Sequence, residues 1–457
     1  MRVTYLFVGL FLAMMGYLVY FHVAQSRDII NSPYNVRLDS MADRVVRGQI
    51  LDRDGEVLAR TDVAEDGTET RKYPYGDVFA HVVGYDSHGK SGLESTTNFQ
   101  LLTSNAFFIE RLAKEVREEK NMGDNIITTL DASVQQAAYD ALGRYKGAVV
   151  VLEVSTGKIL AMVSKPDFNP NTLAADWKEI TTGEESVLLN RATQGLYAPG
   201  SVFKLVTTLA YMRENAHYDN YQYQCEGEIT HGDTTIHCAK NRVHGEESLK
   251  SALANSCNAS FSDIGLSLNL SKYQNVAEDL LFNSELPSVL PYSKSRFPLR
   301  TDAADAEVMM TAIWQGKTLV SPYHMALLSA SIANGGLLME PYLVDRIENY
   351  TGASVKKYMP RKYTRLMKSE EAARLKEYMT AVVESGTASE LRGQSFTAAG
   401  KTGTAEYSSD KDKAHSWFMG FTNVDNPELA ISVVVENADN SGKSAVSVAK
   451  KVLNAYY

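Results

Sequence analysis

The sequence predicts an α+β fold for residues 145–457, in which one antiparallel sheet is flanked by helices. Near the start of this stretch, GAVVVLEV (147–154) and KILAMVS (158–164) predict a hairpin. Near its end, SWFMGFTN (416–423) and ELAISVVVEN (428–437) predict two further strands. The roughly 250 residues between the two pairs are mostly helical in pattern. A sheet built from both ends of a domain, with helices between, is typical of the α+β class.

An uncharged apolar run opens the chain. Residues 3–24 contain no Asp, Glu, Lys or Arg, and at about 1.5 Å per residue such a helix spans the roughly 30 Å hydrocarbon core of a bilayer. A cleaved signal peptide would have a shorter apolar run and a small-residue cleavage site, whereas only a poor His-Val-Ala sequence precedes Gln25. We therefore expect a transmembrane anchor over residues 1–24, with a cleaved signal peptide as the alternative. With a cytoplasmic N-terminus, the rest of the chain lies outside the cytoplasm, but Arg2 indicates orientation only weakly because Arg27 flanks the other end.

A smaller module of mixed strands and helices is expected over residues 25–144. The segment RGQILDRDGEVLA (47–59) predicts two short strands around a turn at Asp54-Gly55. Farther along, Asp131 is a good N-terminal cap for a helix, because its carboxylate can accept from the first free backbone N–H groups. The apolar face of that helix is predicted to consist of Val134, Ala137, Ala138 and Leu142.

The charge balance and the histidines exclude several functions. The chain has 46 Lys and Arg against 55 Asp and Glu, a formal net charge of −9, so it has no bulk attraction to nucleic acid or to an acidic membrane surface. Its nine histidines include no HExxH motif and no paired ligand spacing, so no metal site is expected.

The three cysteines are too few for a disulfide scaffold. Cys225 and Cys238, with twelve residues between them in a strand-turn-strand stretch, either form a disulfide outside the cell or remain separate thiols. Cys257 is expected to be a small buried residue that points away from the side on which Ser256 and Asn258 lie.

One of six S-x-x-K patterns stands in a setting that suits nucleophilic chemistry. Ser201 follows Pro199-Gly200 and opens a largely apolar helix, so its backbone N–H is free and lies at the positive end of the helix dipole. Lys204, three residues later, lies on the same face and can reach the Ser201 hydroxyl. A serine needs a base to take its proton, and lysine can be that base if burial and a second cation lower its pKa. Lys401 is the candidate for the second cation.

Two later segments complete a candidate site. Ser256-Cys257-Asn258 falls in the loop that ends a predicted helix (247–254), where a hydroxyl and an amide can face a cleft. Lys401-Thr402-Gly403-Thr404 precedes the last strand pair, and its glycine would let a strand edge approach a substrate backbone closely.

The ordered set Ser201-x-x-Lys204, Ser256-x-Asn258 and Lys401-Thr402-Gly403 resembles that of penicillin-binding proteins and serine β-lactamases. The intervals of 55 residues from Ser201 to Ser256 and of 145 residues from Ser256 to Lys401 resemble those of class B penicillin-binding proteins. The similarity extends to residues 47–59 and to residues 147–171, which resemble the N-terminal signature and the start of the catalytic domain of that class. The resemblance implies a transpeptidase domain with an all-helical subregion at 145–457, a dimerisation-type pedestal at 25–144 and an anchor at 1–24.

The resemblance also implies the catalytic roles. Ser201 would attack the carbonyl of the penultimate D-alanine of a peptidoglycan stem peptide, with Lys204 as the base. Ser256 would relay the proton to the leaving amine with help from Lys401. The backbone N–H groups of Ser201 and Thr404 would form the oxyanion hole, where one donor is typically worth roughly 10²–10³ in rate. No metal or organic cofactor is implied.

Substrate contacts and partners follow in the same way. Asn258 would hydrogen-bond the substrate amide, Thr402 and Thr404 would bind the terminal carboxylate, and Gly403 would let the strand edge come close. The implied partners are stem peptides, β-lactam antibiotics, the membrane through the N-terminal helix and a membrane glycosyltransferase, with no nucleic acid. The sequence does not distinguish elongation, division or sporulation.

Three other functions remain as alternatives: a D,D-carboxypeptidase, a β-lactamase-like hydrolase and a non-catalytic scaffold of a cell-wall synthesis complex. A class A β-lactamase needs a Glu-x-x-Leu-Asn loop between the second and third motifs, and the nearest string, residues 278–282, has Phe282 in the last position. A carboxypeptidase differs only in using water as the acceptor, but the pedestal segment resembles that of the transpeptidases.

Overall fold

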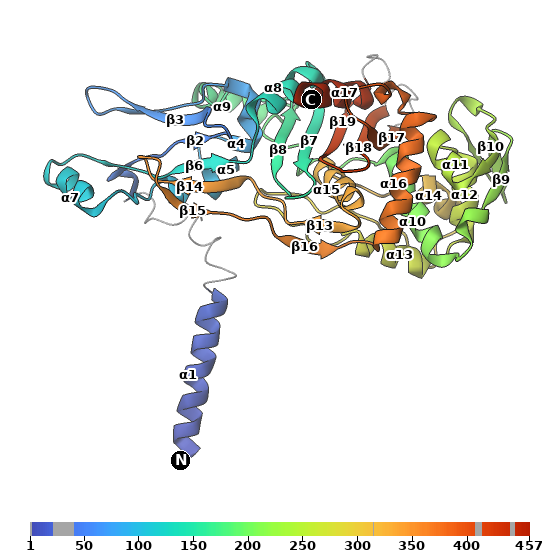
Figure 1. Ribbon diagram of the computed structural model, residues 1–457, viewed down its shortest axis with the longest axis horizontal. Coiled ribbons are helices and arrows are strands. Elements are labelled where there is room, and N and C mark those ends of the chain that lie inside the picture. Colours follow the sequence, from blue (N-terminus) through green and yellow to red (C-terminus); the bar gives the residue numbers. More distant parts are fainter. Residues whose placement is uncertain (1, 22–40, 314, 407–413, 439–443) are drawn as a thin grey trace.

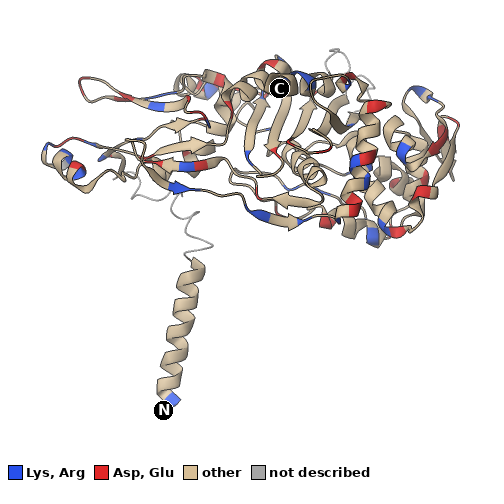
Figure 2. Cartoon of the chain, viewed as in Figure 1, with Lys and Arg blue, Asp and Glu red and all other residues tan. Residues whose placement is uncertain are grey.

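The computed structural model describes residues 2–21, 41–313, 315–406, 414–438 and 444–457 (Figure 1). The first element is helix α1 (Arg2–Tyr20), in which no residue is buried. Arg2 is its one charged residue, and the rest of the helix is tan in Figure 2. With a mean hydropathy of 1.9, α1 is the one helix among the described residues that is long and apolar enough to cross a membrane.

The N-terminal module is built on a six-stranded sheet in the order β15-β14-β6-β2-β3-β4. Its strands are β2 (Ile50–Leu51), β3 (Val57–Val63), β4 (Glu69–Lys72), β6 (Asn125–Thr128), β14 (Val344–Glu348) and β15 (Ser354–Lys357). The predicted turn joins β2 to β3, where Asp52 Oδ1 accepts from the backbone N–H groups of Asp54 and Glu56, both at 2.8 Å. Strands β14 and β15 come from the second half of the chain, and the sequence did not indicate that they extend this sheet.

Short elements surround that sheet. The parallel pair β1 (Val45–Val46) and β5 (Asn121–Met122) is accompanied by η2 (Gly76–Phe79), α4 (Ala80–Val83), α5 (Gly92–Thr96), α6 (Asn98–Leu101) and α7 (Phe108–Val116). A buried ion-pair network joins α5 to the sheet: Glu94 on α5 is fully buried and accepts from Arg47 Nε at 2.6 Å and from Nε of Arg71, on β4, at 2.7 Å. Burial alone would raise the pKa of Glu94, but the two guanidinium groups outweigh it and hold that pKa below its usual value.

The large sheet of the second module is antiparallel and has the order β17-β18-β19-β7-β8. Its strands are β7 (Gly147–Glu153), β8 (Ile159–Lys165), β17 (Ala398–Glu406), β18 (Ala414–Thr422) and β19 (Leu429–Val435). The predicted hairpin and the predicted C-terminal strands are therefore confirmed, and β7 pairs with β19 to join the two ends of the module. The sequence placed Gly403 at a strand edge but did not predict the extent of β17, because the Lys-Thr-Gly-Thr sequence at its centre lacks the alternating apolar residues of a half-buried strand.

Helices cover both faces of this sheet, since every residue of β19 is buried. Helices α8 (Ala132–Leu142) and α17 (Ala445–Tyr456) pack on each other and on one face. The fully buried α15 (Pro322–Ala333) packs on β7, β18 and β19 from the other face, and α16 (Ser369–Glu384) packs on β17. The predicted cap of α8 is present, because Asp131 Oδ1 accepts from Ser133 N at 3.0 Å and Val134 N at 3.1 Å.

The stretch between β8 and β17 contains the helical subregion. Its other helices are α9 (Leu173–Thr182), α10 (Lys204–Glu214), α11 (Leu249–Asn255), α12 (Asn258–Ser267), α13 (Leu270–Asp279) and α14 (Asp305–Ile313), with short turns η3 (Gly200–Phe203), η4 (Tyr218–Asn220), η5 (Ala239–Asn241) and η6 (Ser389–Leu391). The prediction that this stretch is mostly helical missed its short strands, which besides β14 and β15 are β9 (Gln222–Cys225), β10 (Glu228–His231), β11 (Thr234–His237), β12 (Gly245–Ser248), β13 (Leu337–Met339) and β16 (Lys362–Arg365). They are three or four residues long, and β10 and β16 are largely exposed, so they lack the long apolar alternation that a sequence pattern detects.

Candidate active site

Ser201 lies on the short turn η3, directly before α10, and faces the edge strand β17. Two glycines make this approach possible. A Cβ on Gly200, whose φ is +61°, would lie 3.0 Å from the Thr404 carbonyl, and a Cβ on Gly403 would lie 3.1 Å from Ser201 N. The backbone of Gly403 and Thr404 therefore lies against the free N–H groups at the start of the Ser201 turn, as an oxyanion site built from these two segments requires.

Lys204 is fully buried at the start of α10 and donates three hydrogen bonds. Its Nζ lies 2.7 Å from Ser256 O, 3.3 Å from Ser256 Oγ and 2.7 Å from Asn258 Oδ1. Burial lowers the pKa of Lys204 to about 7. The amine can therefore be neutral near physiological pH, which a general base requires.

Ser256 links the two buried lysines. It ends α11 in the left-handed conformation, with φ of +58°, and its Oγ accepts from Lys401 Nζ at 3.0 Å as well as from Lys204. Lys401, also fully buried, donates to Thr402 O at 2.9 Å. Burial and the neighbouring Lys204 charge hold the pKa of Lys401 well below its usual value. Because two ammonium groups would repel each other, the state in which one of the two lysines is protonated is favoured over the state in which both are.

The hydrogen bonds of Lys204 differ from the sequence prediction in one respect. Lys204 was expected to reach the Ser201 hydroxyl, but among the hydrogen bonds of the described residues its Nζ donates to Ser256 and Asn258. Ser201 and Lys204 still lie on the same face, because side chains three residues apart eclipse each other on a 3₁₀ turn. Ser256 and Asn258 are therefore the observed partners of the lysine.

The more exposed side of β17 carries the two predicted threonines. Thr402 is half-buried and Thr404 exposed, whereas Lys401 and Gly403 are buried, as the two-residue period of a strand requires. Thr387, in the loop after α16, lies with its Oγ1 2.5 Å from Thr402 Oγ1. The Gly386-Thr387-Ala388 segment also resembles the family, but no role for Thr387 was predicted from it.

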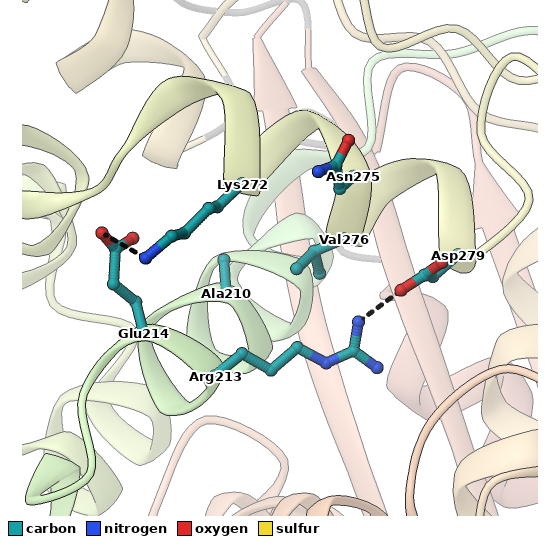
Figure 3. Close-up of a pocket in the computed structure, with 7 residues that line it drawn as sticks. All are labelled: Ala210, Arg213, Glu214, Lys272, Asn275, Val276 and Asp279. Carbon is teal, nitrogen blue, oxygen red and sulfur yellow. Dashed lines mark hydrogen bonds and ion pairs between the residues drawn. The ribbon is translucent and has the colours of Figure 1, made fainter.

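The surface hollow drawn in Figure 3 is not this site. It lies between the end of α10 and α13, where Arg213 donates to Asp279 at 2.7 Å and Lys272 pairs with Glu214 at 3.7 Å. Its lining residues are Ala210, Arg213, Glu214, Lys272, Asn275, Val276 and Asp279. None of the predicted site residues is among them.

Comparison with known protein families gives both modules an assignment. Residues 147–454 match the penicillin-binding protein transpeptidase domain, and residues 47–126 match the penicillin-binding protein A dimerisation domain. The chain belongs to the penicillin-binding protein transpeptidase family. The family resemblance and the fold class that the sequence predicted are thereby confirmed.

Relatives of this penicillin-binding protein span almost its whole length. The peptidoglycan D,D-transpeptidase PbpA of Mycolicibacterium smegmatis is 34% identical over 416 residues, which cover 86% of this chain and 84% of the relative. A solved structure of penicillin-binding protein A from Mycobacterium tuberculosis, a ceftriaxone acyl-enzyme complex, is similar with a TM-score of 0.83 and 30% identity, covering 92% of this chain and 99% of that one. A D,D-transpeptidase domain from Eggerthella lenta is similar with a TM-score of 0.80 and 30% identity, covering 90% and 98%.

Proposed function

We propose that this penicillin-binding protein is a peptidoglycan D,D-transpeptidase that cross-links stem peptides through an acyl-enzyme on Ser201. The observation that carries the proposal is the hydrogen-bonded set of two buried lysines and one serine, Lys204, Ser256 and Lys401, beside the Ser201 turn. A buried amine with a pKa of about 7 supplies a base at neutral pH. The relative from M. smegmatis bears the name of the same activity.

Acylation begins when Ser201 Oγ attacks the carbonyl carbon of the penultimate D-alanine. Neutral Lys204 takes the hydroxyl proton, and the backbone N–H groups of Ser201 and Thr404 stabilise the negative charge that develops on the carbonyl oxygen. The peptide bond then breaks, and the departing amine of the terminal D-alanine receives a proton through Ser256 Oγ, to which both lysines donate. The products are the acyl-enzyme and free D-alanine.

The second half of the reaction transfers the acyl group. The amine of a neighbouring strand attacks the ester carbonyl, loses a proton through the same base, and releases Ser201 as the alcohol. A β-lactam follows only the first half. When its ring amide bond breaks, the amine stays attached to the acyl group, so no leaving group departs and the acyl-enzyme remains. Solved acyl-enzyme complexes of the M. tuberculosis relative with ceftriaxone, imipenem and penicillin G support covalent inhibition of this chain as well.

Substrate positioning is assigned to the second and third motifs. Asn258 presents its amide toward the substrate backbone, with its orientation fixed because Oδ1 accepts from Lys204 and Nδ2 donates to His237 O at 2.9 Å. The half-buried Thr402 and the exposed Thr404 offer hydroxyls to the terminal carboxylate. Among the described residues, β17 is an edge strand of the large sheet that pairs with β18, so its other edge lets the substrate add as a further strand beside Gly403.

Transpeptidation is tested by following both products. Full-length protein in detergent, given a stem pentapeptide donor and an amine acceptor, is expected to release D-alanine and form a cross-linked product in comparable amounts. D-alanine release with no cross-link would identify a carboxypeptidase, and rapid turnover of penicillin without a stable adduct would identify a β-lactamase. Failure of both peptide reactions and of penicillin acylation would leave only the scaffold role.

We further propose that residues 1–24 anchor the protein in the membrane, that 25–144 form a pedestal, and that 145–457 form an extracytoplasmic transpeptidase domain. Helix α1 supports the anchor, because it is apolar, long enough to span and free of buried contacts. Full-length protein is expected to remain with membranes after high-salt and alkaline-carbonate washing. On intact spheroplasts, external protease should cleave the catalytic domain, and protection of that domain would reverse the proposed orientation.

A membrane glycosyltransferase is the partner we propose for glycan synthesis. The two matched segments of this chain correspond to a dimerisation domain and a transpeptidase domain, and cross-linking requires glycan strands that a polymerising enzyme supplies. Chemical cross-linking in membranes before solubilisation should capture such an enzyme with this protein, and its absence among the captured proteins would contradict the proposal.

A further inference from the structure

Three buried cysteines and one histidine lie together behind the second motif. The ligand atoms of Cys225, Cys238, His244 and Cys257 all lie within 4.8 Å of one another. All three cysteines are free. Of the two alternatives left open for Cys225 and Cys238, a disulfide or separate thiols, the structure therefore shows separate thiols. We refer to these four residues as the Cys3His cluster.

Four different segments contribute to the cluster. Cys225 ends β9, Cys238 precedes η5, His244 precedes β12, and Cys257 is the N-cap of α12. The antiparallel pairing of β9 with β12 brings His244 close to Cys225, since Cys225 pairs with the next residue, Gly245. The convergence of these segments is a property of the folded chain, because the side chains are spread over 33 residues of sequence.

Three of the six separations within the cluster match those of a tetrahedral zinc site, and the other three are at most 4.8 Å. With Zn–S bonds of about 2.3 Å and a Zn–N bond of about 2.0–2.1 Å, tetrahedral geometry places two sulfurs about 3.7–3.8 Å apart and a sulfur and a nitrogen about 3.5 Å apart. Cys238 Sγ lies 3.7 Å from Cys225 Sγ and 3.7 Å from Cys257 Sγ. Cys225 Sγ lies 3.4 Å from His244 Nδ1.

The surroundings also suit thiolate ligands. The three cysteines are at most 2% exposed and His244 is half-buried, so a bound ion would be shielded from water on its sulfur side. The backbone N–H and the hydroxyl of Ser260 lie 3.4 Å and 3.1 Å from Cys257 Sγ, and both can donate to it. Such donors to a ligand sulfur are the outer contacts that hold metal-bound cysteines. A disulfide would use two of the four side chains, whereas a metal ion would use all of them.

We propose that the Cys3His cluster binds one structural zinc ion through three thiolates and one imidazole. Four protein ligands close the coordination sphere, which is typical of structural rather than catalytic zinc. Binding releases the three thiol protons to solvent. The proposal departs from the expectation, drawn from the sequence, that the chain holds no metal.

The zinc site would position the second motif of the transpeptidase, a consequence that rests on the proposed function. Cys257 stands between Ser256 and Asn258, so its ligation fixes the backbone that carries both side chains. Cys238 follows His237, whose carbonyl accepts from Asn258 Nδ2 at 2.9 Å. One ion would thus hold both the motif and the loop against which Asn258 is oriented.

The zinc content of the protein tests the proposal directly. Untagged full-length protein, purified in detergent from cells grown with zinc, is expected to contain about one zinc per chain by mass spectrometry of the metal. In His244→Ala the content should fall below about a tenth, because a first ligand is lost. The matched control is His231→Ala: this histidine lies on the neighbouring hairpin, is exposed and pairs with Asp305, so zinc should be retained.

Cobalt substitution in the unmutated protein supplies a readout that does not depend on folding of a variant. Exchange of zinc for Co²⁺ should produce the absorption bands of a tetrahedral, thiolate-ligated cobalt ion. Three results would each overturn the proposal. One is a purified protein that contains no zinc and gives no such cobalt bands, and another is an unchanged zinc content in His244→Ala. The third is a Cys225–Cys238 disulfide in protein taken from membranes. Zinc in a protein that forms no cross-links would refute the proposed function and leave the metal site standing.

Discussion

Ser201→Ala is expected to abolish covalent labelling of this protein by penicillin. The substitution removes one oxygen from a nearly buried side chain on η3, directly before α10, so the nucleophile is lost while the packing around it remains. Gel detection with a fluorescent penicillin and the mass of the intact protein measure the adduct, and thermal unfolding checks the fold. A stable acyl adduct on the variant would show that another residue is the nucleophile.

A second serine of the same sequence pattern serves as the matched control. Ser447 also precedes a lysine by three residues, but it lies in the first turn of α17, where its hydroxyl donates to Ser444 O at 2.8 Å. Ser447→Ala is expected to be labelled at the rate of the unmutated protein. Loss of labelling in this variant would mean that the assay reports folding and not the nucleophile.

Lys204→Ala is expected to slow acylation by roughly 10²–10⁴, the usual contribution of a positioned general base. The unmutated protein should show the pH profile of that base. Because burial lowers the pKa of Lys204 to about 7, the neutral amine predominates above that pH. Second-order acylation rates should therefore rise with pH around about 7 and then level off, whereas a lysine of ordinary pKa would give rates still rising near pH 10.

Lys401→Arg separates the two lysines. A guanidinium keeps the charge but not the compact shape of the ammonium that donates to Ser256 Oγ, so acylation should be slower without being lost. Its permanent charge should also repel a proton on Lys204 and move the midpoint of the pH profile to lower pH. The interaction between the lysines would be contradicted if the midpoint of the pH profile did not move in Lys401→Arg and if Lys204→Ala and Lys401→Arg slowed acylation equally.

The sequence predicted the parts of the fold that carry strong local patterns. The β7–β8 hairpin and β19 are continuous apolar runs bounded by turns, and Asp131 caps α8 as expected. Strand β17 has no such pattern. Its Lys401 is buried, and the hydrogen bonds that Ser256 Oγ and Thr402 O accept from the lysine are not visible in the sequence. Its place in the sheet follows from pairing with β18, which is a tertiary interaction.

The difference between local sequence patterns and tertiary interactions also applies to the candidate active site and the Cys3His cluster. The three motifs proposed to be catalytic have short internal spacings, so a sequence can indicate them and the fold then brings them together. The Cys3His cluster has a C-x12-C-x5-H-x12-C spacing that no short ligand motif describes. Only the pairing of β9 with β12, and the position of Cys257 at the start of α12, bring its ligands within reach of one ion.

The pairing of β7 with β19 has a consequence for biosynthesis. Strand β7 is made before the nucleophile turn, but its partner is among the last segments of the chain to be synthesised, and β18 and β17 join the sheet only beyond β19. Such long-range pairing cannot form while the chain is still emerging from the ribosome, and it folds slowly afterwards. The large sheet therefore stays incomplete through most of translation, and the strands that face the Ser201 turn join it only when synthesis is nearly finished.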